Sequence, residues 1–133
     1  MMAQALQLLS LARKGGLAEL GEDAVGGAAR ARHARLLIVA SDAAAHTVRR
    51  AENYAQTAAC PLVRVDADKQ TLGWAVGRST CALAALTDPG LALRFAQAVG
   101  TVPPETLELL AERKARMEDR RREAKAHRNK TKK

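Results

Sequence analysis

The chain has 133 residues, enough for one domain and an appendage, and its formal net charge is +8. Of its residues 47% are hydrophobic, yet the only aromatic residues are Tyr54, Trp74 and Phe95. A core made mostly of Ala, Leu and Val favours close helix packing. This composition argues against a large small-molecule site, which usually has aromatic walls.

The positive charge is concentrated at the C-terminal end of the chain. Residues 112–133 carry eleven Lys or Arg against four Asp or Glu, a net charge of +7. Residues 1–111 carry eleven against ten, a net charge of +1. The globular part is therefore close to neutral, and the charge that suggests a nucleic-acid partner lies in the tail.

The cysteines and the N-terminal segment indicate a cytoplasmic protein. Cys60 and Cys81 form neither a metal-type cluster nor a disulfide framework, and we expect a reducing compartment. Residues 1–14 have the pattern of an amphipathic helix and not of a signal peptide, and no segment is apolar over the length of a membrane span. The three histidines share no ligand spacing with each other or with a cysteine, so we expect no metal and no cofactor.

In chain order, the first predicted elements are a helix over residues 2–14, which Gly15-Gly16 ends, and an extended segment over 17–20. Gly21 then opens a second helix that runs to about Arg32. The Gly26-Gly27 pair inside it indicates close approach of another backbone or a ligand, unless the pair is merely tolerated. Residues 36–40 are a continuous apolar run, typical of a strand buried on both faces.

Ser41 and Asp42 end that strand and are expected to cap a helix over residues 43–58. For Asp42 the alternative is a ligand contact, because ligands often bind at the carboxyl ends of strands in α/β folds. A strand over residues 61–65 follows. Asp68 then caps a short helix that ends near Gly77.

The last part of the globular region is a third buried strand over residues 81–86 and a helix from Thr87-Asp88-Pro89 to Val99, where we expect the core to end. Alternating strands and helices with short connections predict an α/β fold. Pro103-Pro104 then breaks the chain, and a basic helical tail begins. Its weak apolar stripe ends at Met117, and residues 128–133 are expected to be disordered. We therefore divide the chain into a domain, 1–101, and a tail, 102–133.

Five segments taken in order resemble a known family. They are residues 9–16 (LSLARKGG), 21–25 (GEDAV), 37–43 (LIVASDA), 72–77 (LGWAVG) and 85–88 (ALTD). Together they are similar to the bacterial YlxQ-type branch of the L-seven-Ae family of kink-turn RNA-binding ribosomal proteins, with its L-thirty-e relatives. The resemblance covers roughly residues 5 to 100. It implies a three-layer α/β/α sandwich with a small mixed sheet.

The resemblance also implies an RNA-binding site at the start of the second helix, the loop after the first long strand and the loop before the last strand. Helix N-termini and such loops present free backbone N–H groups, which suit phosphate oxygens. Transferred by position, the site consists of Gly21, Glu22, Asp23, Ala24, Ser41, Asp42, Arg78, Ser79, Thr80 and Cys81.

The sequence departs from the family pattern at several positions. Archaeal-type kink-turn binders have an Asn-Glu pair after the glycine and a Lys three residues past the Glu, where this chain has Asp23, Ala24 and Gly27. An Asp carboxylate cannot donate to a base edge as an Asn amide does. Bacterial relatives usually have a Lys at the position of Trp74.

Other residues allow two interpretations. Residues 78–80 are either a phosphate clamp or a solvated loop. Trp74 could stack on a base, but we expect a partly buried packing residue. Arg30, Arg32, His33 and Arg35 could touch a phosphate backbone, although we favour a polar turn. The tail is either a solvated charged face or an RNA-binding arm that contacts phosphates through Arg120, Arg121 and Arg122.

We predict a monomeric RNA-binding protein, ribosomal or ribosome-associated, that forms a ribonucleoprotein with rRNA or another structured, kink-turn-like RNA. No Gly-rich phosphate loop, GxSxG motif or carboxylate pair stands out, so we do not expect an enzyme. The alternative is a protein-interaction or assembly factor that retains the fold and has lost specific RNA binding.

Overall fold

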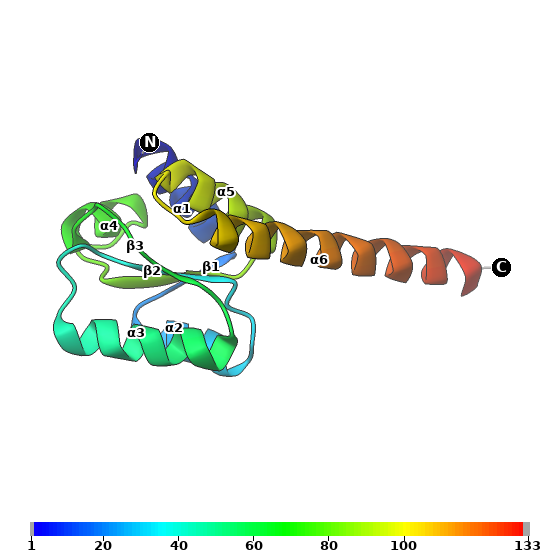
Figure 1. The fold of residues 1–133 in the computed structure, drawn as a ribbon, viewed down its shortest axis with the longest axis horizontal. Coiled ribbons are helices and arrows are strands. Elements are labelled where there is room, and N and C mark those ends of the chain that lie inside the picture. The colour runs from blue at the N-terminus through cyan, green and yellow to red at the C-terminus, as the bar shows by residue number, and fades with distance from the viewer. Residues whose placement is uncertain (1, 132–133) are drawn as a thin grey trace.

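The computed structural model describes residues 2–131 and leaves Met1, Lys132 and Lys133 outside the described residues (Figure 1). The elements in chain order are α1 (Met2–Lys14), β1 (Ala18–Leu20), α2 (Glu22–Arg30), β2 (Leu36–Val39), α3 (Ala45–Ala58), β3 (Leu62–Arg64), α4 (Lys69–Ala75), β4 (Leu83–Leu86), α5 (Pro89–Val99) and α6 (Pro104–Thr131).

The strands form one mixed sheet in the order β1-β4-β2-β3. β2 and β3 are parallel, whereas β4 is antiparallel to both β1 and β2. Every residue of the two central strands is buried. The continuous apolar runs therefore predicted central strands correctly, because both faces of these strands lie against helices.

Helices cover both faces of the sheet (Figure 1). Leu36 and Ile38 of β2 pack with Leu9 of α1 and Phe95 of α5 in one apolar cluster. Leu37 and Val39 face the other way and pack with residues of α2 and α3 in a second cluster, which includes Val25 and Ala51. The predicted three-layer α/β/α sandwich with a small mixed sheet is confirmed.

Most predicted helix ends are confirmed by hydrogen bonds or backbone angles. The Asp68 carboxylate accepts from the backbone N–H of Thr71, and the Asp88 carboxylate accepts from that of Leu91. Gly100 ends α5 with a φ of 81°. The predicted cap of α3 is wrong, however. α3 begins at Ala45 after a non-capping Ala44, so neither Ser41 nor Asp42 lies at its start.

The tail is more ordered than the sequence predicted. α6 projects from the body as one long helix (Figure 1). Its Leu110 is fully buried in the first apolar cluster, so the core continues past Val99. Disorder was expected over residues 128–133, but the helix continues to Thr131. The last two residues of that segment, Lys132 and Lys133, lie outside the described residues.

Candidate nucleic-acid interface

The start of α2 leaves backbone donors available at the end of the sheet. Gly21 is the N-cap residue of α2, has a φ of 88° and provides no side-chain cap. Its own N–H donates to the carbonyl of Leu83, which fixes the helix start to β4. The first N–H groups of a helix have no partner within the helix. Those of Glu22, Asp23 and Ala24 therefore form a nest suited to a phosphate oxygen.

The Glu22 side chain is engaged within the fold. Its carboxylate accepts a hydrogen bond of 2.8 Å from Thr47 Oγ1 and one of 2.8 Å from Arg50 Nη1, both on α3. The hydrogen bond from Thr47, together with the Arg50 charge, holds the pKa of Glu22 below its usual value, although partial burial opposes this. Glu22 thus stays ionised and fastens the start of α2 to the start of α3. Its carboxylate does not add a free negative charge beside the N–H groups.

Arg78 lies directly beside the nest. A Cβ atom built on Gly21 would lie 3.7 Å from Arg78 Nη1. The loop that carries Arg78 is held in place by a 2.8 Å hydrogen bond from its backbone N–H to the carbonyl of Gly73. Arg78, Ser79 and Thr80 are all exposed. The structure therefore brings together the two parts of the predicted site that lie more than fifty residues apart in the chain.

The loop after β2 lies at the same end of the sheet and is tied to α4. Asp42 Oδ1 accepts a 2.8 Å hydrogen bond from the backbone N–H of Lys69, and Arg64 Nη2 donates to the carbonyl of Ser41 at 2.6 Å. Asp42 and Asp68 together satisfy donors at the start of α4. Asp42 consequently has a capping role, but for a helix that begins 27 residues later.

Cys81 is placed differently from the rest of the predicted site. Its side chain is buried, its backbone N–H donates to the carbonyl of Lys69, and its thiol contacts the carbonyl of Leu83 at 3.4 Å. Burial raises the pKa of this thiol. Cys81 thus joins the Arg78 loop to α4, and its side chain is almost wholly shielded from solvent.

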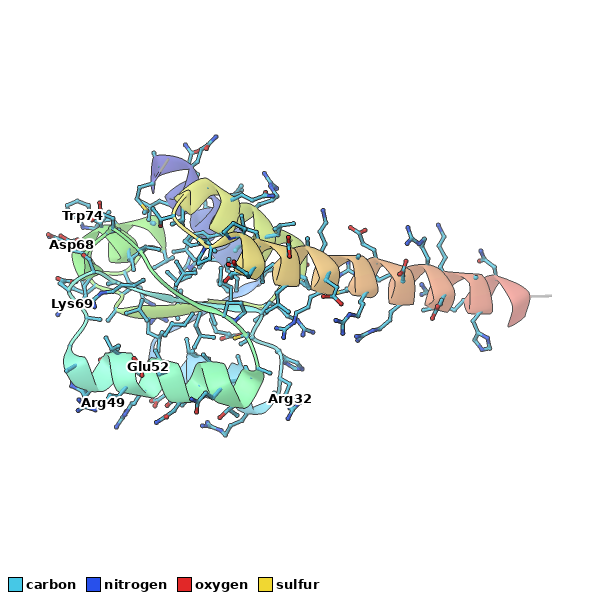
Figure 2. The ribbon with its side chains drawn as sticks, in the orientation of Figure 1. Arg32, Arg49, Glu52, Asp68, Lys69 and Trp74 are labelled. Atoms are coloured by element: carbon cyan, nitrogen blue, oxygen red, sulfur yellow. The ribbon has the colours of Figure 1, made fainter. Side chains whose placement is uncertain are left out.

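Trp74 is more exposed than predicted. Its relative accessibility is 69%, which contradicts the expected packing role. Leu72 and Gly73 form the buried side of α4, and Val76, which follows the helix, is also buried, so the helical repeat turns Trp74 outward. Figure 2 shows it with Asp68 and Lys69 at the end of the molecule opposite to the projecting part of α6. Its indole face is free to stack on a base.

Arg13 is a residue that the sequence reasoning missed. It lies in the last turn of α1, and a Cβ atom on Gly77 would lie 3.9 Å from its guanidinium group. The guanidinium group of Arg13 therefore lies beside Gly77, the residue that precedes Arg78 in the chain. In the sequence, a basic residue before Gly15-Gly16 has the pattern of an ordinary helix C-terminus, and that pattern conceals the contact.

The predicted tail contacts lie at the other end of the molecule. Arg120, Arg121 and Arg122 lie on the exposed part of α6, which points away from α4 (Figure 1). Arg122 pairs with Asp119, and Arg121 Nη2 lies 3.9 Å from Asp88 Oδ1. The tail therefore does not extend the surface around Gly21 and Arg78.

No protein-family model matches the sequence, and no curated protein matches it. Solved structures do match. One is a protein of unknown function from Bacillus halodurans, with 28% identity and a TM-score of 0.68 over 74% of this chain and 98% of that one. Another is the 15.5kD RNA binding protein of Giardia lamblia, with 21% identity and a TM-score of 0.60 over 82% of this chain and 88% of that one.

The chain has the fold of that RNA-binding protein. About a quarter of the chain lies outside the match to the Bacillus structure, whereas nearly all of that neighbour is covered. The similar fold therefore extends over nearly the whole neighbour, and this chain has further residues beyond the matched part.

Neither a metal-binding cluster nor a membrane-spanning helix is found within residues 2–131. This range contains no group of three or more His, Cys, Asp or Glu side chains that could hold a metal ion. No helix within it is both long and apolar enough to cross a membrane.

Proposed function

We propose that the chain is an RNA-binding protein of the L-seven-Ae type, a YlxQ-like member. It binds structured RNA through Gly21–Ala24 and Arg78–Thr80, which lie together at one end of the sheet. The observation that carries this proposal is the Arg78 guanidinium beside the uncapped start of α2. Such a pair supplies a cation and a set of N–H donors to one phosphate. The function is binding without turnover.

The likeness to the Giardia lamblia RNA-binding protein supports the same assignment at the level of the fold. We further propose a ribosomal or other cytoplasmic structured RNA as the partner, with a kink-turn as the preferred shape. Asp23, Ala24 and Gly27 replace the side chains that usually read bases, so backbone contacts carry the recognition. The preference for a kink-turn over a plain duplex is accordingly weak.

The test compares the affinity of the full chain for a kink-turn and for a duplex of equal length at physiological salt. Wild-type protein is expected to prefer the kink-turn, and Arg78→Glu to abolish that preference by placing a carboxylate beside phosphate. Arg94→Glu is the matched control, because Arg94 is exposed and lines the separate groove between α1 and α5. Gly21→Val is a weaker test, since a φ of 88° strains any branched residue.

Equal affinity of the wild-type chain for the two RNAs would overturn the proposal. It would favour a second function, an assembly or interaction factor that keeps the fold and binds a protein partner. The exposed indole of Trp74 is the observation that favours this alternative, because exposed aromatic side chains are frequent anchors of protein interfaces.

A further inference from the structure

A second concentration of arginine side chains lies at the opposite end of the sheet. Arg35 immediately precedes β2, and Arg113, Arg116 and Arg120 follow one another on successive turns of α6. With Pro89 and Met117 these four arginines line a concavity of about 120 Å³. The residues come from three separate parts of the chain, and α6 has to pack against α5 to bring them together.

The positive charge of this arginine pocket is poorly balanced within the fold. Arg116 pairs with Glu112 at 2.8 Å, which lies on the helix outside the pocket lining. Within residues 2–131, neither Arg113 nor Arg120 forms an ion pair, and Arg35 Nε is buried without a hydrogen-bond partner. A buried donor without a partner costs free energy, and so does the convergence of like charges.

One side of the pocket is partly shielded from water, since Arg35 and Arg113 are half-buried, whereas Arg116 and Arg120 are exposed. Cys60 lies close enough for Arg113 and Arg35 to lower the pKa of its thiol, although burial dominates and raises that pKa to about 11. Arg35 and Arg113 therefore adjoin a partly dehydrated region, where a guanidinium group interacts more strongly with an anion than it does in open water.

From this geometry we infer that the arginine pocket is a second RNA-binding site, which takes one phosphate of an RNA backbone. A volume of about 120 Å³ is well below that of pockets for drug-sized ligands, so the pocket fits a single phosphate group and not a whole nucleotide. Guanidinium groups bind phosphate through paired N–H donors. Arg35 lines the pocket, and its buried Nε has no hydrogen-bond partner within the fold.

The rest of α6 favours a polymer over a free phosphate ion. Beyond the pocket the helix carries Arg121, Arg122 and Lys125 on its exposed surface. A backbone that places one phosphate in the pocket can continue along these residues, whereas a single ion gains nothing from them. Arg32 lies at the same end of the molecule as the pocket, but on the side of the sheet that α2 and α3 cover (Figure 2).

The inference is independent of the proposed site at Gly21 and Arg78, and the experiment keeps the two apart. The Arg35 Nε–Hε signal is followed by NMR in the full-length protein, with Arg35→Lys used to assign it. RNA duplex and inorganic phosphate are added in separate titrations. We expect both to shift the signal, and we expect the RNA-induced shift to persist in an Arg78→Glu background.

Two double variants separate the pocket from general charge. Arg113→Gln/Arg120→Gln removes two lining charges, and Arg49→Gln/Arg94→Gln removes two exposed charges that lie outside the lining and on other helices than α6. The first should abolish the Arg35 response and lower duplex affinity about tenfold more than the second, the value of one charge-assisted hydrogen bond. Arg120→Gln alone replaces the first variant if loss of the half-buried Arg113 side chain prevents folding.

Three results would overturn the inference. One is an Arg35 signal that responds to neither ligand. Another is a response to inorganic phosphate without a response to RNA, which would identify a site for a free anion. The third is an equal loss of RNA affinity in the two double variants, which would reduce the pocket to unspecific charge.

Discussion

Replacement of Gly73 by alanine tests how tightly the Arg78 loop is packed on α4. A Cβ atom on Gly73 would lie 2.7 Å from Thr80 Cα, 2.8 Å from Thr80 N and 2.8 Å from Arg78 O. All three are backbone atoms, so no side chain can rotate away to make room. The loop has to move, or α4 has to shift, and overpacking of this kind costs about 1–3 kcal/mol.

Gly27→Ala is the matched control, because Gly27 also lies inside a helix but a Cβ atom added there would have no neighbour within 4 Å. Alanine improves helix propensity by about 1 kcal/mol at both positions, so the difference between the variants isolates the steric cost. We expect Gly27→Ala to be neutral or stabilising. Gly73→Ala should be less stable than Gly27→Ala by about 1–3 kcal/mol.

Denaturant unfolding of both variants measures this difference, and thermal melting should show roughly 4 °C per kcal/mol. Displacement of the loop should also move Arg78 away from Gly21 and weaken RNA binding in Gly73→Ala alone. Equal stability of the two variants would refute the close packing of Gly73 against the loop.

Three further predictions concern the tail, Glu22 and the cysteines. Deletion of residues 112–133 keeps the buried Leu110 and should lower the log–log salt slope of RNA binding by about 0.7 to 0.9 for each phosphate that the tail no longer binds; an unchanged slope would exclude the tail from binding. The folded-state pKa of Glu22 is lowered, so its stabilising effect is present above the usual value of 4.5 and is lost as the pH falls through the folded pKa; in acid titrations of stability, Glu22→Gln should lack this part of the decline, and identical profiles would contradict the assignment. Cys60, with a pKa raised to about 11, and the buried Cys81 should react with iodoacetamide slowly in the native protein and rapidly after unfolding; fast native labelling at about pH 8 would contradict the raised pKa of Cys60 and the burial of Cys81.

Local signals in the sequence predicted the fold because they act over a few residues. The apolar runs at β2 and β4, the Asp68 and Asp88 caps, and the glycine at the end of α5 each depend on near neighbours. The Gly26-Gly27 pair was less well predicted. The expected close approach was that of another backbone or a ligand, but the group beside Gly26 is the side-chain ring of Tyr54, whose nearest atom would lie 2.9 Å from an added Cβ, and a Cβ added at Gly27 would have no neighbour within 4 Å.

The errors and omissions arise where distant segments meet. Asp42 has the pattern of a cap for the next helix, but its hydrogen bond goes to Lys69, and no local pattern reports that partner. The exposure of Trp74 follows from the side of α4 that packs against the Arg78 loop, which is a tertiary fact. The arginine pocket is the extreme case, since Arg35 is separated from the arginines of α6 by more than seventy residues, and they meet because α6 packs on the core, where Leu110 is fully buried.

The central strand β2 connects these two ends of the protein and fixes their separation. Arg35 precedes it and Ser41 follows it, six residues further on, so the two ends lie about 20 Å apart at the extended-chain rise. Every residue between them from Leu36 to Ala40 is buried, and a slip by one position would turn each side chain to the wrong face of the sheet. β2 therefore holds the two ends at a fixed distance. An RNA that contacted both ends would have to present two phosphates about 20 Å apart, because the protein cannot stretch to meet them.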